Sequence, residues 1–490
     1  MIKVYVSRFN SEIDKEPHLE CYEIKKTPQM KVLDALQAIN EKYNADISFR
    51  SSCRAGQCGS CGILYKGNGA LACQKEIQDG AIIEPLKFPV IKDLIVDKSS
   101  VEAKVKDLNL SLQCNHKNEL DTDINKQDSA KTKKVRSCIE CYSCLSTCPV
   151  VNIATEEFGG PYLMRYISKF ESDPREKFDR LKEALDEGLY NCTSCGKCLS
   201  VCPKNINTFG DAIERMRAIA VANGSGPLPE HVSFRENIEK NGRSIKTDKT
   251  PFIKEATNKT GSKIAFFTGC MVDYKFPEIG HTLVNILKEN GIDIDVPEEQ
   301  VCCGSPLLRT GQTELVQKLV DKNKEVFKEY DTVLTVCSGC GSTLKNNHPE
   351  FGSNLNVMDV SEFLVDKLDS SKMHNVDMKV TWHDPCHLGR GQNIKDQPRE
   401  IIEMIPGVEF EEMKYPCQCC GAGGGIKSGK PDIALDLSKS KAEMIKDTGA
   451  EAVITICPFC ELNLQDGLDA IGANDIKSMH ILELLKKAYE

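Results

Sequence analysis

Apolar and polar residues alternate in short stretches near the N-terminus. Ile2, Val4 and Val6 point to one face, as the residues of a half-buried strand do. Further on, one segment carries its apolar residues at helical spacing. The pattern predicts strands over 2–6, 19–24, 63–65 and 81–86 and a helix over 30–43. These elements predict a small α+β domain over residues 1–100.

The middle of the chain is less regular. Residues 101–136 are polar and lack clear periodicity, so we expect a connector. The region 137–225 has helical patterns at 162–187 and 209–223 around two cysteine clusters, which predicts a separate domain. Residues 224–262, with Gly, Pro, Lys and Asn, predict a second linker.

The last part of the chain contains an internal repeat. Residues 263–375 run KIAFFTGC, helix, IDIDVP, CCG, helix, DTVLTVCSGC. Residues 376–490 run KVTWHDPC, helix, VEFEEM, CQCCG, helix, EAVITICPFC. Strands that alternate with helices predict a duplicated α/β unit, and several cysteines directly follow a strand, where α/β folds place their sites.

Length and composition set the class. The chain has 490 residues, of which 40% are hydrophobic and 28% charged, so several domains with real cores are expected. A net charge of -9 disfavours a nucleic-acid partner. No apolar run is long enough for a membrane span, and MIKVYVSRFN lacks the apolar core of a signal peptide. We therefore expect a cytoplasmic protein.

Cysteine is the most informative residue type, with 25 copies. In a cytoplasmic chain, metal ligation or redox chemistry explains so many cysteines better than disulfides do. All but three of the cysteines fall into four regular groups. Cys21, Cys114 and Cys417 stand outside and are expected to be ordinary free thiols.

The first group matches the plant-type [2Fe–2S] pattern. It reads C-x4-C-x2-C-x11-C and comprises Cys53, Cys58, Cys61 and Cys73. Gly56, Gly59 and Gly62 lack a Cβ and permit a tight loop around a cluster. A zinc knuckle is the alternative, but zinc sites favour paired C-x2-C units that lie far apart.

The second and third groups both read C-x2-C-x2-C-x3-C-P, the run of two-cluster ferredoxins, in which the fourth cysteine serves the other cluster. One [4Fe–4S] cubane is therefore expected at Cys138, Cys141, Cys144 and Cys202. The other is expected at Cys192, Cys195, Cys198 and Cys148. Zinc or a purely structural role is the alternative.

The fourth group is a pair of cysteine quintets, one in each repeat. They comprise Cys270, Cys302, Cys303, Cys337 and Cys340, and Cys386, Cys419, Cys420, Cys457 and Cys460. Five thiolates are one too many for a tetrahedral zinc or an ordinary cubane. Adjacent cysteines diverge, so a centre that uses both needs an open, irregular shape. Structural zinc and a vicinal disulfide switch are the alternatives.

The first 225 residues resemble the iron–sulfur subunit of succinate dehydrogenase and fumarate reductase. The matching stretches are SSCRAGQCGSC with LAC, and the two Cys-Pro runs. The resemblance implies a β-grasp [2Fe–2S] ferredoxin domain and an all-α two-cluster domain. Most members lack one cysteine in the second run and hold [3Fe–4S] there. Here Cys195 is present, so this resemblance does not identify residues of the chain that would lie near a quinone.

The last 230 residues resemble the cysteine-rich CCG domain pair in the catalytic subunit of heterodisulfide reductase. Related pairs occur in glycolate oxidase and anaerobic glycerol-3-phosphate dehydrogenase. The fusion of both parts resembles the thiol-dependent fumarate reductases of methanogens. This resemblance implies two noncubane [4Fe–4S] clusters, at which the thiols of coenzyme M and coenzyme B become the heterodisulfide. The electrons would reach fumarate on a separate FAD-containing flavoprotein subunit.

Several further residues are candidates for binding or proton transfer. Arg309, Arg390 and Lys427 lie near the cysteine ligands and would suit the anionic tails of the coenzymes, or else are solvated surface cations. His383 and His387 flank Cys386 and would relay protons or serve as core histidines. GAGGG at 421–425 resembles a cluster loop more than a phosphate cradle.

Two other functions stay open. One is an electron-transfer subunit that links a succinate, glycolate or glycerol-3-phosphate dehydrogenase to a quinone. The other is a zinc-stabilised binding module. Both quintets are complete, which favours the thiol-oxidising enzyme subunit, because a docking module would tolerate the loss of ligands.

Overall fold

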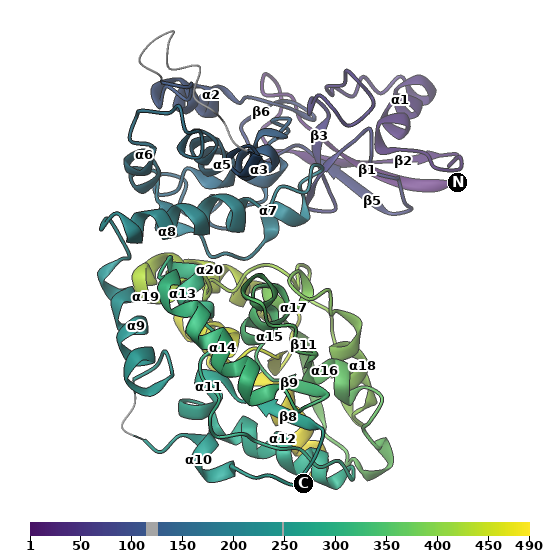
Figure 1. The fold of residues 1–490 in the computed structure, drawn as a ribbon. Coiled ribbons are helices and arrows are strands. Elements are labelled where there is room, and N and C mark those ends of the chain that lie inside the picture. The colour runs from purple at the N-terminus through teal and green to yellow at the C-terminus, as the bar shows by residue number, and fades with distance from the viewer. Residues whose placement is uncertain (114–125, 247–248) are drawn as a thin grey trace. The chain divides into compact units, whose positions relative to one another are not determined.

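The computed structural model of the chain divides into two compact units (Figure 1). It describes residues 1–113, 126–246 and 249–490, so Cys114 lies outside the described residues. Unit 1 comprises Met1–Leu189 and Gly196–Met216, and unit 2 comprises Tyr190–Cys195 and Arg217–Glu490. The short segment Tyr190–Cys195 thus belongs to unit 2, although unit 1 supplies the chain on both sides of it.

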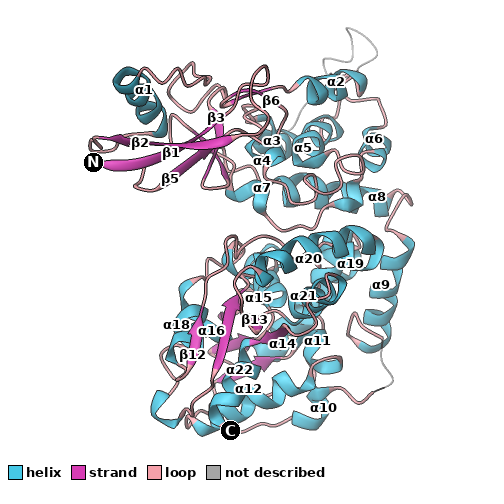
Figure 2. Cartoon of the chain, turned by 180° about the vertical axis from the view of Figure 1, so that it is seen from behind, coloured by secondary structure: helices cyan, strands magenta, loops and turns pink. Residues whose placement is uncertain are grey.

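A five-stranded mixed sheet with one helix forms the N-terminal part of unit 1 (Figure 2). Its order is β2-β1-β5-β3-β4. Val4 and Val6 of β1 are buried in one core with Leu36 of α1, so the alternation of the sequence corresponds to an inner face. The elements are β1 (Ile2–Arg8), β2 (His18–Ile24), α1 (Val32–Tyr43), β3 (Gly62–Tyr65), β4 (Asn68–Leu71), β5 (Ala81–Glu84), β6 (Val90–Lys92) and β7 (Ile95–Val96).

The rest of unit 1 is helical. Helix α5 buries most of its residues, including Tyr162 and Ile167, and α6 packs against it. The elements are α2 (Ser99–Asp107), α3 (Lys126–Arg136), α4 (Ser143–Ser146), α5 (Gly160–Glu171), α6 (Arg180–Asp186), α7 (Lys197–Ser200) and the π-helix η3 (Thr208–Glu214); η2 (Leu189–Asn191) and α8 (Arg215–Ala222) each span a boundary between the two units.

Unit 2 contains the duplication that the sequence predicts. Its first copy has a parallel sheet in the order β10-β9-β8, and Asp295 bridges to Ala265 on the free side of β8. Its second copy has the parallel order β12-β11-β13-β14. The two sheets therefore correspond strand by strand, with β12 in the place of the single bridge at Asp295.

The elements of the first copy are β8 (Ile264–Phe267), α11 (Gly269–Tyr274), α12 (Pro277–Glu289), α13 (Ser305–Thr310), η4 (Thr313–Leu315), α14 (Val316–Phe327), β9 (Thr332–Thr335), α15 (Ser338–Asn346), η5 (His348–Phe351), β10 (Val357–Asp359), α16 (Val360–Leu364) and η6 (Ser370–Lys372). Those of the second copy are β11 (Met378–Trp382), α17 (Cys386–Gly389), α18 (Asp396–Met404), β12 (Val408–Phe410), α19 (Ile426–Gly429), α20 (Pro431–Lys446), β13 (Ala452–Thr455), α21 (Pro458–Ala470), β14 (Lys477–His480) and α22 (Ile481–Tyr489).

One hydrophobic core joins the two copies. Leu283 of α12, Trp382 of β11 and Leu485 of α22 are all fully buried members of the same cluster. At its edge the Asn290 Nδ2 atom donates a hydrogen bond of 3.0 Å to the Tyr489 hydroxyl. Because the copies share this core, the cysteines of both are held by one packed body.

Two predicted linkers are wrong. The interval 101–136 contains most of α2 and all of α3, and the interval 224–262 contains α9 (Pro229–Asn241) and α10 (Phe252–Ala256). Helix α2 buries no residue and α9 buries only His231 and Ile238, so neither has a strong apolar stripe for the periodicity to reveal. Pro229 in the first turn of α9 and Gly242 just after its end are the signals that mark this helix.

None of the helices among residues 1–113, 126–246 and 249–490 combines the length and the apolarity needed to cross a lipid bilayer.

The packing of α10 on α12 gives a stability prediction. A Cβ on Gly280 would lie 2.6 to 2.8 Å from three ring atoms of the fully buried Phe252. Gly280→Ala should therefore destabilise unit 2 by about 1–3 kcal/mol and speed proteolysis near α10. Phe252→Leu in the same chain relieves the overlap. The double variant should therefore lose less protease resistance than the sum of the losses in the two single variants. Simple additivity would contradict this contact.

Candidate functional site

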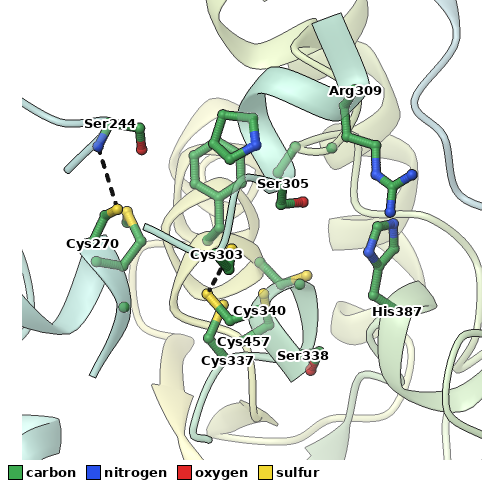
Figure 3. A pocket seen from close by; sticks show the side chains of 18 of the residues that line it. Ser244, Cys270, Cys303, Ser305, Arg309, Cys337, Ser338, Cys340, His387 and Cys457 are labelled. Carbon is green, nitrogen blue, oxygen red and sulfur yellow. Dashed lines mark hydrogen bonds between the residues drawn. The ribbon is translucent and has the colours of Figure 1, made fainter. Parts of the chain in front are cut away.

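All ten cysteines of the two quintets line one cavity of about 360 Å³ in unit 2 (Figure 3). The two halves of the repeat thus face a common space. The cysteines of the cavity wall are Cys270, Cys302, Cys303, Cys337, Cys340, Cys386, Cys419, Cys420, Cys457 and Cys460.

The ends of four strands bring four of these cysteines together. Cys270 follows β8, Cys337 follows β9, Cys386 follows β11 and Cys457 follows β13. Cys337 and Cys457 also occupy the N-cap positions of α15 and α21. The N-terminus of a helix favours negative charge, so these two positions suit thiolates.

The paired cysteines depend on the glycine that follows them. Gly304 and Gly421 have φ values of 84° and 93°, a conformation that other residues rarely adopt. The N–H of each glycine donates to the first cysteine of its pair, Cys302 or Cys419, with a distance of 3.4 Å in both copies. The turn thereby fixes the direction of the first thiol and leaves the second free to point elsewhere.

The second cysteine of each pair lies against the last cysteine of its quintet. The sulfur atoms are 3.5 Å apart in Cys303–Cys340 and 3.4 Å apart in Cys420–Cys460. Both separations are less than twice a metal–sulfur bond of about 2.3 Å. The two thiols of each couple can therefore bind the same metal centre.

These contacts favour the thiolate of the second cysteine. Hydrogen bonds from the Cys302 and Cys340 thiols lower the pKa of Cys303 to about 5. In the second copy, hydrogen bonds from Cys419 and Cys460 hold the pKa of Cys420 well below its usual range. The thiolate is the form that binds metal, so both copies are prepared for it at the same position.

Ser244 is a site residue that sequence reasoning missed. Its backbone N–H donates to Cys270 Sγ at 3.4 Å, and its side chain lies at the cavity in Figure 3. The neighbouring Arg243 is buried and forms an ion pair of 2.6 Å with Asp273. No motif marks these residues, because they lie in the interval that the sequence predicts to be a linker.

The cavity is cationic and partly apolar. Of the candidate cations, Arg309 lines it, and so does Lys275, which the sequence did not single out. None of the described residues in the cavity wall carries a carboxylate. The apolar part of the wall is formed by Phe234, Ile245, Met271, Phe459 and Leu462. Such a wall suits small molecules that join an anionic group to an aliphatic one.

The side chains of Arg309 and His387 both lie in the cavity wall and point toward each other (Figure 3). Burial and the Arg309 charge lower the pKa of His387 to about 4, so the imidazole is neutral near pH 7. Its Nε2 atom lies 3.2 Å from the carbonyl oxygen of Ser194. His383 is also buried, and burial lowers its pKa, although the Cys420 thiol beside it acts in the opposite direction.

The other two candidate cations do not line the cavity. Arg390 donates to the carbonyl oxygens of Cys195 and Cys417, at 2.7 and 2.5 Å. Lys427 pairs with Asp466 and donates to Asn463. The structure therefore places only Arg309 of the three in the wall of the thiol-lined space.

One group of side chains in the described part of the chain could hold a single metal ion. It consists of His383, Cys420 and Cys460, whose ligand atoms lie within 4.8 Å of one another. Zinc in the second copy would use these three residues. Sequence reasoning treated His383 as a proton relay or core residue and missed it as a possible ligand.

A smaller cavity of about 30 Å³ in unit 1 gathers the first cubane group. Cys138, Cys141, Cys144 and Cys202 all line it, together with Cys198. The fourth cysteine of the second run thus lies beside the first three of the first run. The spacing of two-cluster ferredoxins predicts such an exchange, and the division of the ligands between the two cubanes stays a prediction.

The [2Fe–2S] group forms an exposed loop in unit 1. Cys53 and Cys58 are exposed, and Cys61 and Cys73 are buried. The N–H groups of Ala55 and Gln57 donate to Cys53 Sγ at 3.4 and 3.3 Å, as expected for a loop that directs backbone donors at sulfur.

Two glycines of this loop have a second role besides the predicted one. A Cβ on Gly59 would overlap the carbonyl oxygen of Ile139, and a Cβ on Gly62 would lie 2.7 Å from that of Cys141. The loop therefore packs directly on the first cubane run, and its glycines allow this approach between two loops.

The donor set fits iron–sulfur centres. All ten quintet positions offer sulfur, and soft thiolates favour Cu(I), zinc and iron–sulfur clusters over harder metal ions. The five sulfurs of each copy also exceed what a single zinc ion binds. The cysteines of the cavity wall can thus bind two polynuclear centres.

The two CCG glycines give a matched prediction. A Cβ on Gly421 would lie 2.6 Å from the Ala434 carbonyl oxygen, whereas a Cβ on Gly304 meets nothing closer than 3.7 Å. Left-handed backbone strain costs about 1–2 kcal/mol in either variant, and Gly421→Ala adds an overlap. We expect Gly421→Ala to lose iron from the anaerobically purified protein more readily than Gly304→Ala. Equal iron contents would show that the second turn is not the tighter one.

Three family models match the chain. They are a 2Fe-2S iron-sulfur cluster binding domain at residues 3–103, a 4Fe-4S dicluster domain at 134–206 and a cysteine-rich CCG domain at 264–345 and 380–465. The protein is therefore a multidomain α/β protein with a 2Fe–2S ferredoxin domain, a 4Fe–4S domain and CCG domains.

The chain is also similar to other proteins over most or all of its length. It is 33% identical to the D subunit of the dihydromethanophenazine:CoB–CoM heterodisulfide reductase of Methanosarcina acetivorans, over 72% of this chain and 93% of that protein. A crystal structure of a hypothetical protein from Helicobacter pylori shares the fold, with a TM-score of 0.65 and 13% identity over 100% of this chain and 94% of the other.

The strongest of these likenesses covers the entire chain. This chain is 53% identical to the B subunit of the fumarate reductase (CoM/CoB) of Methanothermobacter marburgensis, over 100% of this chain and 99% of the relative. The chain belongs to the family of the fumarate reductase (CoM/CoB) B subunits, and it is an oxidoreductase subunit with iron–sulfur domains.

Proposed function

We propose that this chain oxidises two thiols, coenzyme M and coenzyme B, to their heterodisulfide and passes the electrons to a flavoprotein subunit that reduces fumarate. The observation that carries the proposal is the single cavity lined by both quintets. A reaction that joins two sulfur atoms needs both thiols in one space, and a module that only relays electrons does not.

The charge of the cavity supports anionic thiols as the substrates. Arg309 and Lys275 supply positive charge, and no carboxylate of the described wall opposes it. Apolar side chains such as Phe459 and Leu462 would cover an aliphatic chain between the anionic group and the sulfur. Arg309 is placed to bind one anionic group, because its guanidinium can donate several charge-assisted hydrogen bonds.

The reaction balances between two sites. Two thiols release two electrons and two protons as one S–S bond forms, and fumarate takes up two electrons and two protons to become succinate. Two noncubane [4Fe–4S] clusters held by the quintets would act as Lewis acids that favour the thiolate, and would accept the electrons. His387 lies in the wall as a neutral imidazole near pH 7, because burial and the Arg309 charge oppose its protonation and lower its pKa.

Further clusters would connect the cavity to the partner. We assign one [2Fe–2S] cluster to Cys53, Cys58, Cys61 and Cys73, in a β-grasp domain over residues 1–100. Two cubanes belong to the two Cys-Pro runs of an all-α domain over 137–225, with CCG modules at 263–375 and 376–490. The close packing of the Gly59–Gly62 loop on the Ile139–Cys141 segment supports electron transfer between neighbouring clusters.

The decisive experiment purifies the chain with its flavoprotein partner under anoxia. Iron and sulfide are counted, and fumarate reduction is assayed with the two thiols and separately with a reduced quinol analogue. We expect activity with the thiols. A complex that uses only the quinol would refute the proposal and favour an electron-transfer subunit linked to a quinone.

Loss of one quintet ligand should separate the two half-reactions. Cys420→Ser and Cys303→Ser should abolish thiol oxidation yet leave fumarate reduction by an artificial reduced dye intact, because the dye delivers electrons without the thiol site. Cys21→Ser, at an exposed cysteine outside the four groups, is the control and should retain both activities. Loss of dye-driven activity as well would indicate a folding defect.

Arg309 should contribute to substrate binding. A charge-assisted hydrogen bond contributes about 1.5–3 kcal/mol, so Arg309→Gln should raise the KM for at least one thiol about 10- to 100-fold. Lys288→Gln removes an exposed cation of α12 outside the cavity and should leave KM unchanged. An unchanged KM in Arg309→Gln would exclude Arg309 as an anchor.

A further inference from the structure

The segment Cys192–Cys195 is held by cationic and imidazole side chains of unit 2. Arg217 Nη2 donates to the Cys192 carbonyl at 2.9 Å, and Arg390 Nε donates to the Cys195 carbonyl at 2.7 Å. Between them, His387 Nε2 lies 3.2 Å from the Ser194 carbonyl oxygen. Three carbonyl groups of one short loop are therefore bound at once, and two of the three side chains come from the second CCG copy.

The GAGGG loop accounts for the close fit of this segment. A Cβ on Gly424 would overlap the Cys192 carbonyl oxygen, and a Cβ on Gly423 would lie 2.8 Å from that of Thr193. Arg217 Nη1 donates to the Gly424 carbonyl at 3.0 Å and so ties the two loops together. The missing side chains of GAGGG thus admit a cysteine-bearing loop of the same unit.

Arg390 lies between two sets of cysteines. Its Nη1 atom donates to the Cys417 carbonyl, and its Nη2 atom is buried without a hydrogen-bond partner among the described residues. A guanidinium keeps its positive charge at any pH at which the protein is folded. The Cys419 thiol also interacts directly with the Cys195 thiol. A permanent positive charge therefore lies where the second quintet meets the Cys192–Cys195 loop.

The first CCG copy lacks all of these features. In the alignment of the two copies, Met271 and Tyr274 take the places of His387 and Arg390, and Pro306 and Leu307 take the places of Gly423 and Gly424. The segment that contacts the first quintet instead contains Ser244, which donates to Cys270 and carries no thiol. The two quintets share a cavity but differ in what lies behind them.

We infer that the second quintet is the electron outlet of the thiol site, and that Arg390 and the GAGGG loop are the positioning elements that seat the Cys192–Cys195 loop against it. The inference deepens the proposed function, on which it rests for the source of the electrons. Each electron would pass singly from a centre held by the second quintet, which would be oxidised, to a centre that Cys192 and Cys195 help to hold, which would be reduced. No bond forms or breaks in this transfer.

The first test measures reduction potentials of the purified complex by titration with a chemical reductant, monitored by electron paramagnetic resonance. Removing a buried positive charge disfavours the reduced, more negative centre. Arg390→Gln should shift the reduction equilibrium of the cubane at Cys195 at least about tenfold toward the oxidised form. Arg390→Lys keeps the positive charge and should shift the reduction potential of this cubane much less. Lys414 is an exposed cation of the same copy, and Lys414→Gln should leave the potential unchanged.

The second test examines the seat itself. Gly424→Val should weaken the magnetic interaction between the reduced cubane and the centre of the second quintet, and slow electron arrival at the cubane at least tenfold in rapid-freeze experiments. Leu307→Val, at the corresponding position of the first copy, should leave both unchanged.

An unshifted potential in Arg390→Gln, or a magnetic interaction with the centre of the first quintet instead, would overturn the inference. Because the titration uses a chemical reductant, its result is independent of whether the thiols are substrates. Failure of thiol oxidation with intact coupling would therefore count against the proposed function alone.

Discussion

Ligands of one metal centre have to lie within a few ångströms of each other, although this chain carries them tens of residues apart. Unit 2 meets the constraint with parallel strands, whose carboxyl ends deliver Cys270, Cys337, Cys386 and Cys457 to one side. The CCG turns deliver the paired cysteines, because only glycine readily takes the left-handed conformation that follows each pair. The shared core between the copies then fixes the two quintets with respect to each other.

Duplication gives the site its symmetry, and local substitutions remove it. The two sheets follow the same strand order, and the same sulfur–sulfur contact recurs in each quintet. Under the proposed function, two similar centres would take the two thiols, and the electrons would leave by one route. The residues behind the second quintet, Arg390 and the GAGGG loop, have no counterparts of the same type behind the first.

Local charge differs from net charge in this protein. The chain carries a net charge of -9, yet the described wall of the cavity contains Arg309 and Lys275 and no carboxylate. In a partly buried space the nearby charges act through a low effective dielectric constant and dominate over distant surface charges. An acidic protein can in this way present a locally cationic wall to a small molecule.

The sequence by itself divided the cysteines into four groups of candidate ligands, and its internal repeat identified the two α/β copies. It also predicted the N-terminal strands, because their alternation reflects one buried face. It missed α2, α3, α9 and α10, because a helix that buries few residues leaves little periodicity. Only the tertiary structure decided that both quintets line one cavity. It also decided that Arg390 lies outside the cavity wall and donates to the Cys195 carbonyl, and that the Ser244 N–H donates to Cys270. The physical reason is that spacing along a chain encodes which atoms can bind a metal, whereas packing between distant segments determines which of them meet.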